Sequence, residues 1–135
     1  MAEARYGRSG ERMSAICLAA AGASVRLAAV VTLVWTHSIE KVEWRETWRA
    51  TPAGLELVEA RIKGSGAGME PGDDARLEDG WWVWHPGRPA MAEVRLARSG
   101  ATADWRLCVE GTCRTAEAIL GRPMDGEAVR LAPCD

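Results

Sequence analysis

The segment VVTLVWTHSIEKVEWRETWR, residues 30–49, carries the pattern from which the fold class of this chain is predicted. It is rich in β-branched and aromatic residues, which favour strands, and its apolar residues recur at every second position. Because successive side chains of a strand point to opposite faces, this period predicts two strands that share one apolar face. That face is predicted to carry Val31, Leu33, Trp35, His37 and Ile39 from the first strand, and Val42, Trp44, Glu46 and Trp48 from the second.

Short strands separated by glycine and proline turns continue along the chain. Hairpins are predicted at ARLEDGWWVWHP and DWRLCVEGTCR, because Asp79-Gly80 and Glu110-Gly111 suit tight turns. Thr115 and Gly121 are residue types that begin and end helices, so TAEAILG predicts a short helix. Further strands are predicted at GLELVEARIK, AEVRLA and EAVRLAPC.

These patterns predict an all-β fold, either an antiparallel β-sandwich or a flattened barrel, with at most one short helix near the C-terminus. The length of 135 residues and the apolar fraction of 47% fit a single domain with a substantial core. We expect that domain to span residues 13–135.

The start of the chain allows two interpretations. An arginine-rich start precedes MSAICLAAAGAS, residues 13–24, whose apolar run and small-residue end resemble a signal segment. Alternatively, Met13 is the true start, residues 1–12 are a disordered or misassigned extension, and the apolar run is folded protein. A membrane span running on to Trp35 would contain Arg26 near its middle, which is costly in lipid.

Four cysteines predict two disulfides in an oxidising compartment, and three connectivities are possible. Cys108 and Cys113 flank a predicted hairpin turn, where facing positions can reach disulfide geometry. Cys17 and Cys134 lie near the two ends of the chain, and chain ends often lie close together. Free buried thiols are the alternative. A zinc site that adds His85 to three of these cysteines lacks the paired ligand motifs of zinc proteins, so we expect no metal.

A candidate ligand-binding centre lies in the first predicted hairpin. If the chain reverses at Glu40-Lys41, Trp35 faces Glu46 and His37 faces Trp44. The pair formed by His37 and Glu46 would then lie among indoles, and a buried carboxylate needs such a partner. Two alternatives stay open, namely a histidine hydrogen-bonded at the edge of the core and an acid/base pair of a small enzyme.

A glycine-rich loop, GSGAGM, is a second candidate. Its backbone N–H groups can bind a carboxylate, although the phosphate-loop pattern is absent. The alternative is a loop that needs glycine for positive φ or close packing. The candidate residues of this loop are Gly64, Ser65, Gly66 and Gly68.

Three tryptophans occupy the second strand of the ARLEDGWWVWHP hairpin. Trp82 and Trp84 share a face, which leaves Trp81 on the opposite one. A tryptophan exposed there would mark an interface, whereas a strand buried on both sides would need no partner. Both interpretations stay open.

Charge argues against nucleic acid as a partner. The net charge is −2, and the basic residues are scattered along the chain instead of forming a basic stripe. No pattern points to a cofactor or to a serine or thiol nucleophile.

The order of several blocks resembles the domain of unknown function 1850 family. The blocks are WTHSIEK, WRETWR, GSGAGMEP, DGWWVWHP and WRLCVEGTCR, and the resemblance runs from about Val30 to the LAPC ending. It implies no reaction. It implies an accessory protein of TRAP-type transporters, the class that uses TAXI-type solute-binding proteins, because genes of this family often lie beside the membrane subunits.

Together, these observations lead us to expect a non-enzymatic binding domain. It would present a tryptophan-rich sheet face to a TRAP-type membrane subunit, to a solute-binding protein or to a small anionic solute. The alternative is a purely structural module, whose motifs specify folding alone and bind no partner. We expect a periplasmic or other extracytoplasmic location with peripheral membrane association, and a cytoplasmic location is the alternative.

Overall fold

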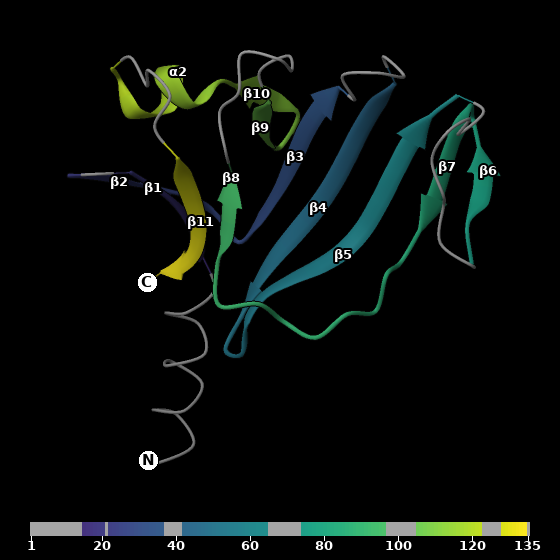
Figure 1. The fold of residues 1–135 in the computed structure, drawn as a ribbon, viewed down its shortest axis with the longest axis horizontal. Coiled ribbons are helices and arrows are strands. Elements are labelled where there is room, and N and C mark those ends of the chain that lie inside the picture. The colour runs from purple at the N-terminus through teal and green to yellow at the C-terminus, as the bar shows by residue number, and fades with distance from the viewer. Residues whose placement is uncertain are drawn as a thin grey trace.

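The computed structural model describes residues 15–20, 22–36, 42–64, 74–96, 105–122 and 128–134. These residues form two antiparallel sheets that pack face to face (Figure 1). The seven-stranded sheet has the order β10-β9-β3-β4-β5-β7-β6, and the four-stranded sheet has the order β2-β1-β11-β8. The sheets are separate, so the sandwich is the architecture that the chain adopts, and the prediction of an all-β fold is confirmed.

The predicted strands from residue 30 onward are all present. The larger sheet comprises β3 (Val30–Thr36), β4 (Glu43–Thr51), β5 (Gly54–Lys63), β6 (Arg76–Glu78), β7 (Trp81–Trp84), β9 (Arg106–Val109) and β10 (Thr112–Arg114). The smaller sheet comprises β1 (Ala15–Ala20), β2 (Ala23–Ala28), β8 (Val94–Leu96) and β11 (Val129–Cys134).

The sequence left residues 13–24 open between a signal-like segment and folded protein, and the described residues of that range lie in β1, in β2 or in the turn between them. The β1 strand lies between β2 and β11, and it buries Ile16 and Leu18 completely. Its Cys17 is joined to Cys134 of β11 by a disulfide. Within the described ranges, no helix is long and apolar enough to cross a membrane.

Two tight turns follow the predicted chemistry. Asp79 and Gly80 between β6 and β7 both have positive φ, of 51° and 85°. Glu110 and Gly111 between β9 and β10 have almost the same values, 51° and 86°. Positive φ at both central residues matches the right-handed twist of the strands that such a turn joins. The second turn brings Cys108 opposite Cys113, and these two form the other predicted disulfide.

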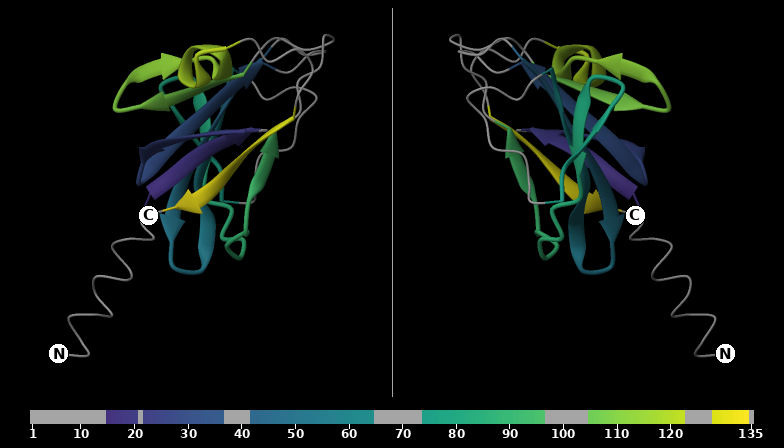
Figure 2. Two further views of the ribbon diagram at one scale, coloured as in Figure 1. Left: turned by 90° about the vertical axis from the view of Figure 1, so that its left-hand side faces the viewer. Right: turned by 90° about the vertical axis from the view of Figure 1, so that its right-hand side faces the viewer.

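The short C-terminal helix, α2 (Ala116–Leu120), has the predicted caps. The side chain of Thr115 accepts a hydrogen bond from the backbone N–H of Ala118, and Gly121 ends the helix in the left-handed conformation. Figure 2 shows α2 and the β9–β10 hairpin together at one end of the sandwich. Buried Ala116 and Ile119 attach the helix to the main core.

The core is divided into two clusters. The larger one lies between the sheets and includes Ile16, Leu33, Trp48 and Leu131. The smaller one lies on the core-facing side of β5 and β7, where β7 and β6 extend away from the four-stranded sheet (Figure 1). Its buried members are Ala60, Ile62 and Trp84.

Candidate functional site

Glu46 lies on β4 between the two core clusters. Its cross-strand neighbours are Leu33 of the larger cluster and Ala60 of the smaller one. Along β3, β4 and β5, Glu46 is the only charged residue whose side chain shares the core-facing side of the sheet. The other charged residues of these strands project from the opposite face.

Three indoles lie on this face, and we call them the indole cluster: Trp35, Trp44 and Trp84. Trp35 and Trp44 are cross-strand partners, and their rings stack with centroids 5.1 Å apart and an interplanar angle of 11°. Trp84 meets Trp44 edge to face, with centroids 6.1 Å apart. Trp35 and Trp44 remain half-buried, so part of their ring surface is accessible.

The observed register corrects one prediction. Trp35 pairs with Trp44, and Glu46 pairs with Leu33, so the pairing of Trp35 with Glu46 was wrong by two residues. An even shift leaves every side chain on its predicted face. For this reason, Trp35, Trp44 and Glu46 still share one side of the sheet. Residues 37–41, His37 included, lie outside the described part of the chain.

The environment of Glu46 favours the protonated carboxyl. Burial raises the pKa of Glu46 above its ordinary value of 4.5, and the Trp48 indole and the Arg88 guanidinium oppose this shift. The Trp48 Nε1–H is buried, and its geometry falls short of a formed hydrogen bond. The Arg88 guanidinium and the Trp48 N–H therefore influence the carboxyl of Glu46, but neither forms a hydrogen bond with it.

Two members of this site were missed from sequence. Trp84 could have been included, because it lies two residues from Trp82 and side chains at this spacing share one face of a strand. Arg88 had none, because it follows β7 in a segment without regular secondary structure. Only the path of that segment brings its guanidinium within electrostatic range of Glu46.

The glycine-rich loop is described only at its first residue. Gly64 has a φ of 88°, and its N–H donates a hydrogen bond of 2.8 Å to the carbonyl of Gly80. That N–H is therefore committed to the protein itself. Ser65, Gly66 and Gly68 lie outside the described residues.

The remaining tryptophans of β7 follow the predicted alternation. Trp82 packs against the smaller core cluster, and its Nε1–H is buried without a hydrogen-bond partner. Trp81 is half-buried on the opposite face, where Arg45 and Lys63 each lie 5.0 Å from its ring centroid. These cation–π contacts account for Trp81 without an additional partner.

His85 also lies on that outer side, away from the indole cluster. Its Nε2 is 3.9 Å from Glu59, and its Nδ1 is 3.9 Å from Asp74. In the described part of the chain, no group of three His, Cys, Asp or Glu side chains is arranged to hold a metal ion.

Chemically, the indole cluster and Glu46 suit a cationic group. A carboxylate attracts positive charge directly, and the faces of indole rings attract it through their quadrupole. Stacked indoles also supply a flat apolar surface for a ligand. An anion at this position would be repelled by Glu46 whenever that carboxyl is ionised.

These features define a class, the small antiparallel β-sandwich held by two disulfides, with one carboxylate set among indoles on its larger sheet. The chain belongs to the family described as domain of unknown function (DUF1850), whose model matches residues 31–115. The match ends before α2, so it is shorter at its C-terminal end than the resemblance indicated. No curated protein and no solved structure matches the chain.

Proposed function

We propose that this protein is a non-enzymatic accessory domain that receives a cationic group of a partner protein at the indole cluster and Glu46. The observation that supports the proposal is the position of Glu46, the one charged side chain on an otherwise apolar face of β3, β4 and β5. A carboxylate there weakens the core unless something compensates its charge. The transporter association rests on the family resemblance.

The sequence left a partner subunit and a small anionic solute as alternatives at this face. The carboxyl of Glu46 favours the partner, because a lysine or arginine side chain complements it and can also stack on Trp44. Such a contact resembles the hot spots of protein interfaces, where tryptophan and arginine recur. We therefore assign the face to a TRAP-type membrane subunit or solute-binding protein that presents a basic side chain.

An extracytoplasmic location accompanies this proposal. All four cysteines are paired in disulfides, which form and persist in oxidising compartments. A periplasmic domain of this kind would reach the outer surface of a membrane subunit by peripheral contact.

The first test uses a small cationic probe. Tetramethylammonium chloride should change the tryptophan fluorescence of the wild-type protein in a saturable way, with sodium chloride at equal ionic strength as the reference. Glu46→Gln should weaken this binding roughly tenfold, since hydrogen bonds and contacts to charged groups contribute about 1.5–3 kcal/mol. The matched control is Glu56→Gln, which changes a carboxylate on the opposite face of the sheet.

Equal affinity of the wild-type protein and Glu46→Gln for tetramethylammonium would exclude a cation site at this carboxyl. The second test co-expresses the full chain with a TRAP-type membrane subunit of the same genome. Co-purification that is reduced in Glu46→Gln and preserved in Glu56→Gln supports the partner contact. Co-purification that is equal in both variants argues against it.

One observation favours the enzyme alternative, because a carboxyl whose pKa is raised by burial can act as a general acid. Turnover of a metabolite panel that is lost in both His37→Ala and Glu46→Gln would replace the binding function by an acid/base activity. Absence of such turnover leaves the binding function in place.

A further inference from the structure

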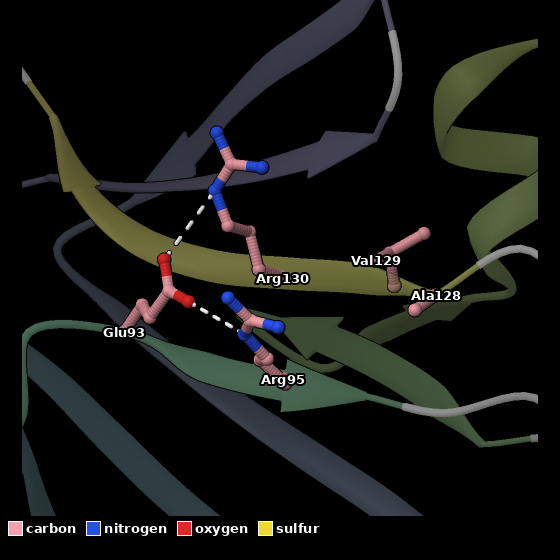
Figure 3. A pocket seen from close by; sticks show the side chains of 5 residues that line it. All are labelled: Glu93, Arg95, Ala128, Val129 and Arg130. Carbon is pink, nitrogen blue, oxygen red and sulfur yellow. Dashed lines mark hydrogen bonds and ion pairs between the residues drawn. The ribbon is translucent and has the colours of Figure 1, made fainter.

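A hollow of about 330 Å³ lies on the outer face of the four-stranded sheet, beside β8 and β11. Figure 3 shows its lining, in which two arginines project from neighbouring strands near a single carboxylate. The lining residues are Glu93, Arg95, Ala128, Val129 and Arg130. Its volume falls at the lower end of the range typical of small-molecule sites.

The register places two like charges side by side. Arg95 of β8 and Arg130 of β11 are direct cross-strand partners. Like charges in this arrangement destabilise a sheet. A charged residue on an edge strand protects against aggregation, which accounts for Arg95 on β8. The same reason does not account for Arg130, because β11 lies inside the sheet between β1 and β8.

One carboxylate serves both guanidinium groups. Glu93 lies 2.8 Å from the Nε of Arg95 and 3.5 Å from the Nε of Arg130, as the dashed lines in Figure 3 show. Within the described part of the chain, Glu93 is the one carboxylate paired with these two arginines, so the group carries one more positive charge than negative charge there. Among the described residues, the terminal Nη groups of both arginines have no hydrogen-bond partner.

Small side chains leave space next to Arg130. Its partner on the other neighbouring strand, β1, is Ala19. Along β11, the residues that share its face are Ala128 and Ala132. Ala128 lines the hollow together with Arg130, and because alanine extends only one carbon from the backbone it leaves that volume open, whereas Ala19 is buried.

We propose that this hollow binds a small molecule bearing a carboxylate or phosphate group, held by the forked N–H donors of Arg95 and Arg130. Glu93 occupies the Nε side of each guanidinium, which leaves the Nη end for the ligand. Arginine suits this task because its planar fork matches both anions in a two-point contact. The site is independent of the indole cluster, which lies on the other sheet.

The test is an NMR titration of the full-length protein at low ionic strength, with inorganic phosphate in one arm and citrate in the other. Saturable shifts of the β8 and β11 amides are expected in at least one arm, which also identifies the preferred anion. Arg130→Gln and Arg95→Gln should each raise the Kd at least about tenfold, as expected when a charged contact is lost. Arg130→Lys should weaken binding similarly, because an ammonium keeps the charge but cannot form the fork.

Arg49→Gln is the matched control, since Arg49 is as exposed as Arg130, with 52% of each side chain accessible, and also pairs with a glutamate. Its affinity should equal that of the wild-type protein. All these arginines form exposed ion pairs, which contribute little to folding, so the variants should remain folded. The proposal is overturned if the Arg95→Gln/Arg130→Gln double variant binds both anions like the wild type, or if Arg130→Lys retains full affinity.

Discussion

At the scale of single residues, Glu46 is the position where stability and function conflict. Its period-two neighbours on β4 are Trp44 and Trp48, which are well suited to a core-facing position. A carboxylate between them loses hydration, and the pKa of Glu46 rises as a result. A leucine or valine would fill this place in a strand selected for stability alone.

The raised pKa of Glu46 predicts a pH-dependent effect of Glu46→Gln. Because the folded protein binds this proton more tightly than the unfolded chain, the contribution of Glu46 to stability falls as pH rises from 4.5 through its folded pKa. Glutamine cannot ionise, so the variant should gain stability relative to the wild type across that range. Thermal unfolding between pH 4 and pH 8 of both proteins measures the difference. A difference that stays constant with pH would contradict the burial of an ionisable carboxyl.

At the scale of elements, turn chemistry determines how the strands meet. The β4–β5 turn ends at Gly54, which has a φ of 132°. The following residue, Leu55, exchanges two backbone hydrogen bonds with Met91, of 2.7 and 2.8 Å. This bridge joins the segment after β7 to the start of β5, and it requires the Met91 carbonyl to approach Gly54 closely.

Gly54→Ala should therefore be strongly destabilising. A Cβ at this position would lie 2.4 Å from the Met91 carbonyl oxygen, and neither backbone can move away without breaking the bridge. We expect a loss of more than about 3 kcal/mol in the free energy of unfolding, measured by urea denaturation. Gly22→Ala is the control, since its φ of 75° is also positive but no atom lies within 4 Å of the added Cβ. It should cost about 1 kcal/mol, and equal costs would show that the contact with Met91 is unimportant.

At the scale of the whole molecule, two disulfides close loops of very different length. The pair formed by Cys17 and Cys134 is separated by 117 residues, and the pair formed by Cys108 and Cys113 by 5 residues. The first joins β1 to β11 within the four-stranded sheet, and the second joins the two strands of one hairpin. The short pair spans a hairpin turn, and the long pair joins cysteines near the two ends of the chain, as their positions in the sequence suggested.

Removing the long-range disulfide should destabilise the protein more than removing the short one. Loop-closure entropy predicts a cost of about 5 kcal/mol for Cys17→Ser/Cys134→Ser and about 2 kcal/mol for Cys108→Ser/Cys113→Ser. Urea denaturation of the two double variants, in parallel with the wild type, measures both costs. The opposite order would show that the β9–β10 hairpin depends on its disulfide for more than loop closure.

The amino-acid sequence alone predicted the strands from residue 30 onward, their faces, the two tight turns and the caps of α2, whereas it left the connectivity of the cysteines open. These features follow from side-chain alternation, turn preferences and spacing, all of which act over a few residues. The shared face of Trp35, Trp44 and Glu46 was predictable for the same reason.

Three features depend on tertiary contacts: the register of β3 against β4, the place of β1 inside the smaller sheet and the partners of the charged residues. A shift by two residues preserves every face, so local alternation cannot distinguish the two registers. Arg88 approaches Glu46, and Arg130 meets Arg95, across long separations in the chain. Such contacts depend on how all the strands pack together, and no local pattern contains that information.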